Sequence, residues 1–346
     1  MFRRTPPSLR GTLLVLLVVS AAAALAPACV NRAGGPAQSS GAPAPASPAA
    51  SPTPTQAPTP AQPPPSGGED AALSSRLAEI CRRAAGECGV AVTHVETGRA
   101  ASVEGERPMP LYSVFKLPLA VAVLQDVEAG RLRLEQSVRV EPAEAAPGTR
   151  ANSDLWREPS DRTLLQLLEF SIVRSDNTSS DKMLELVGGP SAVTERMRAL
   201  GLNNIEVRSN TRDFLRSQEA HPNNGSPADL ARLLARLQRG EVLRPPQLEV
   251  LFGLMGRAET GRQRIRAGVP AGAPVGDKTG SGPATTNDVG LVTLPGGGGH
   301  LALAVLLNNS KVSTAAQEKL IAELARAAYD AFAAGGAGGA GAAAGR

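Results

Sequence analysis

The chain has 346 residues, enough for one large domain or two small ones, and 36 basic against 32 acidic residues give a net charge of +4. The first 68 residues hold four arginines and no acid, so the rest of the chain is electrically balanced. A nucleic-acid-binding domain should show a net basic face, and the scattered His94, His221 and His300 match no metal-site spacing. The composition therefore argues against nucleic acid as a partner, and we expect neither a metal nor another cofactor.

Residues 1–29 have the pattern of an export signal. Arginines precede the apolar run LLVLLVVSAAAALA, and the small residues of APAC lead to Cys29. The run is short for a membrane span. A cysteine directly after small residues is typical of a bacterial lipoprotein, although an ordinary signal peptide with an incidental cysteine is the alternative. We expect an exported monomer, either periplasmic or attached to the membrane only through a lipid on Cys29.

Two further segments have compositions that do not form a core. Residues 30–69 are rich in Pro and Ala, and residues 334–346 are rich in Gly and Ala. Such a linker is extended, at roughly 3.1 Å per residue in polyproline form, and reaches on the order of 100 Å. The pattern therefore predicts a tethered domain over residues 70–333.

The predicted elements of this domain begin and end with strands. A helix over residues 69–85 precedes two short strands in residues 88–105, and an apolar helix follows over residues 114–124, where Pro118 conflicts with regular helical geometry. Helical spacing then dominates until strand patterns appear at residues 273–282, 286–295 and 300–309, before a closing helix over 314–332. The predicted helices of the middle region cover residues 161–174, 179–188, 189–200 and 226–240. This order predicts an α/β (α+β) fold in which both chain ends build an antiparallel sheet, flanked by helices, with an all-helical lobe inserted.

Three cysteines leave one pair for the domain. If Cys29 carries a lipid, Cys81 and Cys88 remain together in an oxidising compartment. A disulfide between them and two separate buried thiols are both open interpretations.

The stretch LYSVFKLPLA, residues 111–120, places one of only five lysines in an apolar helix. Ser113 and Lys116 are three residues apart, which puts the hydroxyl and the amine on one helical face. A desolvated lysine can lose its proton, whereas arginine stays charged, so Lys116 is suited to accept a proton from a serine nucleophile. The pattern S-x-x-K also occurs by chance on surface helices, but the apolar flanks favour a chemical role.

Two other triplets complete a known trio. S-D-N at residues 175–177 follows the apolar LLEFSIVR, and K-T-G at residues 278–280 lies between strand-like segments. Taken alone, the first is typical of a helix cap and the second of an exposed turn. Together with S-x-x-K, however, they stand in the order that marks class A β-lactamases and penicillin-binding proteins.

The spacing of the three motifs resembles that of class A serine β-lactamases. The segments LVGGPSAVTERMRALGLNNIEV and TNDVGLVTLP are also similar to that family, and VGGP is typical of its extended-spectrum branch. The resemblance covers residues 73–332. It implies a hydrolase that opens the ring of β-lactam antibiotics through an acyl-enzyme on Ser113. These substrates are small molecules, and their hydrolysis gives antibiotic resistance.

The resemblance also implies a role for each chemical group. Ser113 would attack the lactam carbonyl, Lys116 would act as base or proton relay, and Ser175 would carry a proton toward the departing nitrogen. The backbone N–H groups of Ser113 and Ser281 would form the oxyanion hole.

Substrate binding would fall to residues of the second and third motifs. Asn177 would hold the side-chain amide of the substrate, and Lys278 and Thr279 would bind its ring carboxylate, with Gly280 and Ser281 completing that strand segment.

The resemblance breaks where the family carries its deacylating glutamate. Counting from Ile205, Thr211 stands in that position, and Asp213 is the nearest following carboxylate. Asp213 is therefore our candidate for the deacylating base, with Glu219 as the alternative. Asp181, on the predicted helix after the S-D-N triplet, is a candidate for ordering this loop.

The arginine–aspartate clamp of the same loop is also missing, because Ser209 and Asn223 stand near those positions. Complete motifs favour a β-lactamase, whereas the missing glutamate favours a penicillin-binding protein or D-Ala-D-Ala carboxypeptidase with slow deacylation. A non-catalytic module that binds cell-wall ligands is a third interpretation, which the presence of both lysines disfavours.

Overall fold

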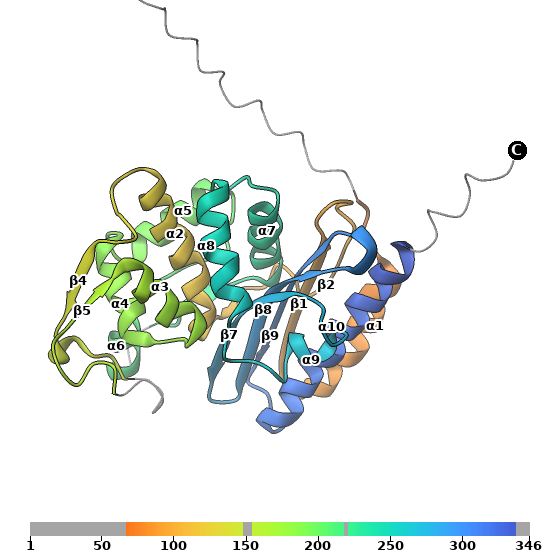
Figure 1. The fold of residues 1–346 in the computed structure, drawn as a ribbon. Helices are drawn as coiled ribbons and strands as arrows, with labels where there is room; N and C mark the ends of the chain where they lie inside the picture. The colour runs from red at the N-terminus through yellow and green to blue at the C-terminus, as the bar shows by residue number, and fades with distance from the viewer. Residues whose placement is uncertain (1–66, 148–153, 218–220, 337–346) are drawn as a thin grey trace, which may run out of the picture. The chain divides into compact units, whose positions relative to one another are not determined.

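The computed structural model describes residues 67–147, 154–217 and 221–336 (Figure 1). The predicted export signal, including Cys29, lies outside these residues, as do most of the predicted linker and tail. Among the helices that are described, none is both long and apolar enough to cross a membrane.

A five-stranded antiparallel sheet unites the two ends of the domain. Its strand order is β2-β1-β9-β8-β7, in which β1 (Glu87–His94) and β2 (Ala100–Val103) come early in the chain and β7 (Val275–Gly282), β8 (Thr285–Thr293) and β9 (His300–Asn308) come late. β1 pairs with β9 along its whole length, so early and late segments share one ladder. The predicted α+β fold with a sheet built from both chain ends is confirmed.

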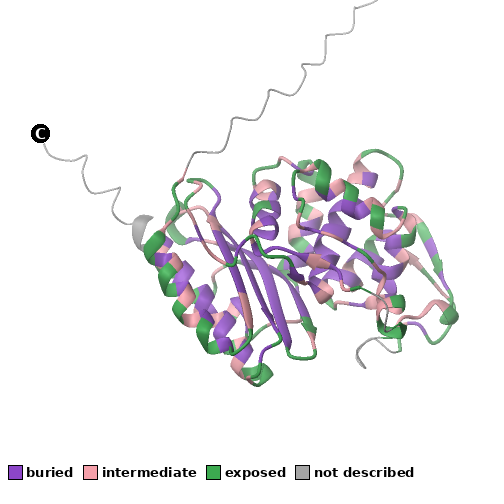
Figure 2. Cartoon of the chain, turned by 180° about the vertical axis from the view of Figure 1, so that it is seen from behind, coloured by how far each residue is buried: buried purple, intermediate pink, exposed green. Residues whose placement is uncertain are grey.

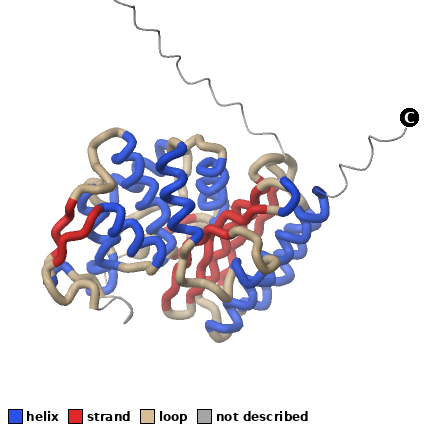
Figure 3. Tube along the Cα trace, in the orientation of Figure 1, coloured by secondary structure: helices blue, strands red, loops and turns tan. Residues whose placement is uncertain are grey.

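Both faces of the sheet are covered by helices, which explains why its central strands are buried on each side (Figures 2 and 3). Along β9, Leu303 and Val305 belong to one hydrophobic cluster and Ala304 and Leu306 to the other, because successive side chains point to opposite faces. The first cluster packs against three helices, namely α1 (Ala71–Cys81), α9 (Ile265–Gly268) and α10 (Thr314–Gly336). The second cluster continues into the helical lobe.

The lobe lies between β2 and β7 in the chain and is mostly helical (Figure 1). Its helices are α2 (Lys116–Glu128), α3 (Leu164–Val173), α4 (Asn177–Leu186), α5 (Pro190–Ala199), α6 (Thr211–Arg216), α7 (Pro227–Gln238) and α8 (Pro245–Gly256). The expectation of an all-helical lobe needs correction, since β4 (Ser137–Val140) pairs with β5 (Ser160–Thr163), and β3 (Met109–Pro110) with β6 (Asn224–Gly225). These strands have two to four residues, too short to give a clear alternating pattern.

Local sequence explains where the lobe helices begin. Thr163 precedes α3 and accepts a hydrogen bond from the Gln166 N–H, while the Gln166 side chain accepts one from the Thr163 N–H, which forms a capping box. Ser226 caps α7 in the same manner through the Asp229 N–H, and Pro227 occupies the first helical position, where no backbone donor is needed.

Ser113 lies one turn before the helix in which the sequence places it. Residues Tyr112–Phe115 form a 3-10 turn, and the α-helix α2 begins at Lys116. Pro118 therefore falls in the first turn of α2, where a backbone N–H has no intrahelical partner, and its conflict with the helix disappears.

A disulfide joins Cys81 at the end of α1 to Cys88 at the start of β1, with the two Cα atoms 5.5 Å apart. This observation decides between the two interpretations of the cysteine pair. The bond connects α1 to β1 near the start of the described domain.

Candidate active site

Ser113 opens into a pocket of about 250 Å³ between the sheet and the lobe. The described residues that line it come from the η2 turn (Tyr112–Phe115), α4, β7 and the loop that contains α6. They are Tyr112, Ser113, Phe115, Asn177, Asn210, Thr211, Phe214, Leu215, Pro222, Asn223, Ser281, Gly282 and Pro283. The pocket is thus lined by Ser113 of S-x-x-K, by Asn177 of S-D-N and by Ser281, which follows K-T-G.

Close backbone packing brings the η2 turn against β7. A Cβ atom at Gly280 would lie 2.3 Å from the Leu111 carbonyl oxygen, and one at Gly282 would lie 2.1 Å from the Tyr112 ring. Only glycine fits at position 280, because the clash is with backbone, whereas a side chain at position 282 would require the Tyr112 ring to move. Tyr112 itself has a φ of 47°, a conformation rare for a non-glycine residue and one that recurs at functional sites. Ser113 and Ser281 consequently line the same pocket.

Lys116 is fully buried beneath Ser113, and its amine contacts neutral oxygens. Its Nζ donates to the Ser175 carbonyl oxygen at 2.6 Å and to Asn177 Oδ1 at 2.8 Å, with Ser175 Oγ at 3.4 Å. Burial lowers the pKa of Lys116 to about 8, although the negative charges of Asp176 and Asp181 oppose this shift. The amine is thus poised to exchange a proton near neutral pH.

Ser175 lies between the two buried lysines. Lys278 Nζ donates to Ser175 Oγ at 3.0 Å and to the Thr279 carbonyl oxygen at 2.9 Å. Burial, followed by the nearby positive charge of Lys116, lowers the pKa of Lys278 well below its ordinary value. Ser175 has a φ of 58°, and this left-handed conformation turns its hydroxyl toward both amines.

Asp176, the middle residue of the second motif, has a structural position. It caps α4 through the Ser179 N–H at 2.7 Å and accepts hydrogen bonds from Ser179 Oγ and from the Trp156 ring N–H. The helix-cap interpretation of the triplet is therefore correct for Asp176. The same cap places Asn177 at the first helical position, where it faces Lys116.

Arg264 is a site residue that the sequence analysis missed. Its guanidinium donates to Ser281 Oγ at 2.8 Å and to the Gly280 carbonyl oxygen at 3.2 Å, from behind the third motif. The side chain is buried and pairs with Glu318. Arg264 is one of three arginines in the segment AETGRQRIRAG, and nothing in the sequence separates it from its neighbours Arg262 and Arg266.

The loop over residues 208–225 is closed by neutral groups. Asn223 Oδ1 accepts the N–H groups of Arg208 and Ser209 at 2.8 and 3.1 Å, and Asn223 Nδ2 donates to the Ser209 carbonyl oxygen at 3.1 Å. Ser209 and Asn223 thus meet where the family's charged clamp is missing. We call this set of contacts the amide clamp.

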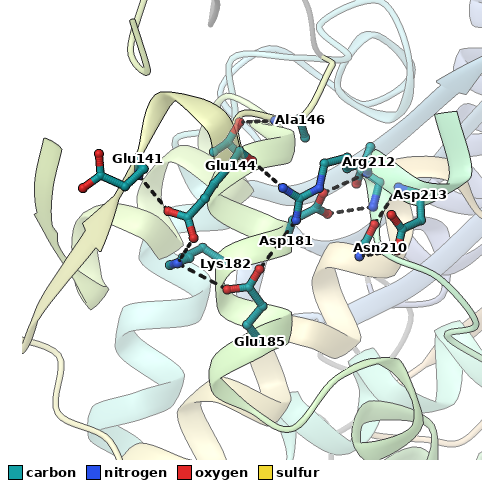
Figure 4. Close-up of polar contacts among 11 residues, drawn as sticks. Glu141, Glu144, Ala146, Asp181, Lys182, Glu185, Asn210, Arg212 and Asp213 are labelled. Carbon is teal, nitrogen blue, oxygen red and sulfur yellow. Dashed lines mark hydrogen bonds and ion pairs between the residues drawn. The ribbon is translucent and has the colours of Figure 1, made fainter. Parts of the chain in front are cut away.

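A second set of contacts anchors α6 to α4 (Figure 4). Asp181 accepts the backbone N–H groups of Thr211 and Arg212 at 2.7 and 2.8 Å, as expected for a residue that orders this loop. The Arg212 side chain reaches the Glu144 carbonyl oxygen and Glu185, and Lys182 pairs with both of these glutamates. Burial raises the pKa of Asp181, and the two N–H donors oppose that shift.

Thr211, which stands where the family carries its glutamate, and the two candidate bases have different positions. Thr211 lines the pocket, and its Oγ1 is buried without a hydrogen-bond partner. Asp213 is exposed, does not line the pocket, and accepts a hydrogen bond from Asn210 Nδ2 at 2.9 Å (Figure 4). Glu219 lies outside the described residues.

Comparison with known proteins gives one family. A model of the beta-lactamase enzyme family matches residues 72–332. The extended-spectrum beta-lactamase PER-1 of Pseudomonas aeruginosa is 33% identical over 64% of this chain and 74% of its own length. A beta-lactamase of Streptomyces albus G is 32% identical over 72% of this chain and 82% of its own.

Solved structures agree with the sequence comparison. A beta-lactamase from Chitinophaga pinensis aligns with a TM-score of 0.72 and 33% identity, covering 75% of this chain and 99% of that one. An ancestral class A beta-lactamase aligns with a TM-score of 0.68 and 34% identity, covering 75% and 100%.

The fold and the pocket, with a serine above a buried lysine and a second lysine on the facing strand, define a serine hydrolase that works through an acyl-enzyme. Within that class, the chain belongs to the class A serine β-lactamases. Its activity is the hydrolysis of β-lactams, which confirms the first of the three interpretations drawn from the motifs.

Proposed function

We propose that Ser113 is the nucleophile and that Lys116 accepts its proton during acylation. Ser113 Oγ opens into the pocket, and the fully buried Lys116 lies one helical turn away. Attack on the lactam carbonyl joins Ser113 Oγ to the acyl carbon and breaks the ring C–N bond. The N–H groups of Ser113 and Ser281 stabilise the oxyanion, and each such donor is worth roughly 10²- to 10³-fold in rate.

The observation that carries this proposal is the position of Ser175. Its hydroxyl lies 3.0 Å from Lys278 Nζ and 3.4 Å from Lys116 Nζ, so it connects the two amines. The proton that Lys116 receives passes through Ser175 Oγ to the departing lactam nitrogen. A hydroxyl relays a proton without a net change because it is both donor and acceptor.

Substrate binding is assigned to the pocket wall around β7. Lys278 and Thr279 hold the ring carboxylate, Gly280 lets the strand approach the η2 turn, and Ser281 completes the contact surface. Asn177 orients the side-chain amide of the substrate, since it lines the pocket and is fixed by Lys116. For the deacylating base, Asp213 is the proposal that the sequence makes, and its exposed position weighs against it.

We also propose that the protein is exported and acts as a monomer. The basic, apolar and small-residue regions before Cys29 support export, and Cys29 is the proposed lipid attachment point. Labelling with a radioactive fatty acid in the producing bacterium tests attachment, and Cys29→Ser should abolish the label.

A chromogenic cephalosporin tests the catalytic proposal. We expect colour from the natural protein, together with a transient mass increase on a peptide that contains Ser113. Ser113→Ala should lose the adduct and at least about 10³-fold of the rate, as for other nucleophile deletions. Ser137→Ala, on an exposed strand outside the pocket, is the matched control. An adduct that persists in Ser113→Ala would disprove the assignment.

A further inference from the structure

The pocket wall contains no carboxylate among the described residues. Its polar side chains are the hydroxyls of Tyr112, Ser113, Thr211 and Ser281 and the amides of three asparagines, at positions 177, 210 and 223. Hydrolysis of an ester intermediate requires a base that takes a proton from water, and neither a hydroxyl nor an amide serves as one at neutral pH. The base must therefore come from groups next to this wall.

The carboxylates nearest the wall are already committed to other contacts. Asp181 uses its two oxygens for the N–H groups of Thr211 and Arg212. Asp176 is buried under Trp156 and Ser179. Asp213 is exposed, is not among the residues that line the pocket, and accepts a hydrogen bond from Asn210. None of the three lines the pocket that contains Ser113.

Among the residues that the structure describes, Lys116 is the remaining base beside Ser113. Its two shortest contacts, to the Ser175 carbonyl oxygen and Asn177 Oδ1, use two N–H bonds, and the third, to Ser175 Oγ, is long at 3.4 Å. No carboxylate of the described residues forms an ion pair with Lys116. The charged groups that face it are Asp176 and Asp181 from the α4 side and Lys278 from β7. Burial holds its pKa at about 8.

The Thr211 hydroxyl is a candidate water site, because it has no hydrogen bond within 3.5 Å, although its interaction with Asp181 opposes the rise that burial causes in the pKa of that carboxyl. Its Oγ1 is buried without a hydrogen-bond partner, yet Thr211 lines the pocket with Ser113 and Asn177. A buried hydroxyl without a partner is costly, and a bound water satisfies it. Such a water would have Thr211 on one side and the Asn177–Lys116 pair on the other.

We propose that Lys116 acts twice, first on Ser113 and then as the base that activates the deacylating water held by Thr211. This deepens the proposed function and rests on its acyl-enzyme at Ser113. The neutral amine takes a proton as the water oxygen bonds to the acyl carbon. When the resulting tetrahedral species collapses, the bond from that carbon to Ser113 Oγ breaks, and Lys116 returns the proton to Ser113.

The test follows the loss of a preformed adduct. The full-length protein is acylated with a penicillin, freed of excess antibiotic, and transferred to buffers between pH 6 and pH 10, and adduct loss is followed by mass spectrometry. We expect the rate constant to rise about 50-fold between pH 6 and pH 8 and then to level off, because the neutral fraction of an amine with a pKa of about 8 behaves in this way. A carboxylate base gives a flat profile over this range, and direct attack by hydroxide gives no plateau, so either result would overturn the proposal.

Variants separate this inference from its rivals and from the proposed function. Thr211→Val should lower the plateau about tenfold, the loss of roughly one hydrogen bond, without moving the inflection. An unchanged plateau would remove Thr211 from the proposal. A plateau lost in Asp213→Asn or in Glu219→Gln, but retained in the control Glu195→Gln, would assign the base to that carboxylate. If no adduct forms on Ser113, the proposed function itself fails, whereas an adduct with a flat profile contradicts only the second role of Lys116.

Discussion

The two walls of the pocket differ in how they hold their shape. The wall built by the η2 turn, α4 and β7 contains two fully buried lysines whose amines meet at Ser175. On the opposite wall, the described residues of the loop over 208–225 line the pocket with hydroxyl, amide and apolar side chains, and the amide clamp joins Ser209 to Asn223. Both buried lysines therefore belong to one wall of the pocket. The described loop residues of the other wall contribute its shape.

The comparison shows that the loop can hold its conformation without the charged groups that the family carries there. Ser209 and Asn223 close the loop through an amide, without a charged pair. Thr211 keeps its backbone contact with Asp181 and still lines the pocket, although it brings no carboxylate. The described part of the loop thus holds Thr211 at the pocket but adds no carboxylate to the pocket lining.

Thr211→Glu should have the largest effect on the difference between the two walls, because it adds a carboxylate to the loop wall. A carboxylate at this position would face the acyl carbon from the loop, and general-base catalysis typically contributes 10²- to 10⁴-fold. We expect the lifetime of the adduct to shorten by about 10²-fold or more, with an unchanged burst of acylation, in stopped-flow measurements with a chromogenic cephalosporin. Thr211→Gln is the neutral control, and an equal effect in this variant would refute the explanation.

Asn223→Ala tests whether the amide clamp holds the loop wall in place, because it should open the loop. It removes three hydrogen bonds, two of which satisfy backbone N–H groups, at about 1 kcal/mol each. We expect about 3 kcal/mol less stability in urea unfolding and a slower loss of adduct. Asn203→Ala, at an exposed position before the loop, is the control. Unchanged stability would show that the amide clamp does not hold the loop.

Lys278→Ala addresses the cationic wall. Without this amine we expect penicillins to be captured about 30-fold less efficiently at low salt, since about 2 kcal/mol is reasonable for one charge-assisted contact. The defect should narrow with rising salt, because salt weakens the attraction that is lost. The second-order rate constant for acylation measures this effect, with exposed Lys311→Ala as the control. Wild-type capture in Lys278→Ala would instead support a merely structural lysine.

Arg212→Ala should have the smallest effect. The Arg212 side chain reaches Glu144 and Glu185 only at 3.4 and 3.7 Å, and such partly exposed pairs contribute about 0.5 kcal/mol. We expect a change in unfolding free energy of this size, far below that of Asn223→Ala. A larger loss would mean that charge, and not the amide clamp, secures the loop.

The sequence predicted the cationic wall better than the loop. S-x-x-K, S-D-N and K-T-G are short, ordered patterns in a chain with few lysines, so their convergence was visible before any coordinates. The 3-10 turn at Ser113 was not visible, because the packing of Leu111 and Tyr112 against Gly280 and Gly282 determines it. The short strands of the lobe and the position of Arg264 likewise depend on contacts between distant segments.

The two buried lysines also determine which ligands the pocket should prefer. Neither Lys116 nor Lys278 forms an ion pair with a carboxylate of the described residues, and burial lowers the pKa of both amines. A substrate that carries a carboxylate brings the counter-ion that this site lacks. An anion that binds only the folded state should therefore raise the melting temperature, by an amount that grows with the logarithm of its concentration above Kd. At equal concentration, the anions that bind most tightly should give the largest rise.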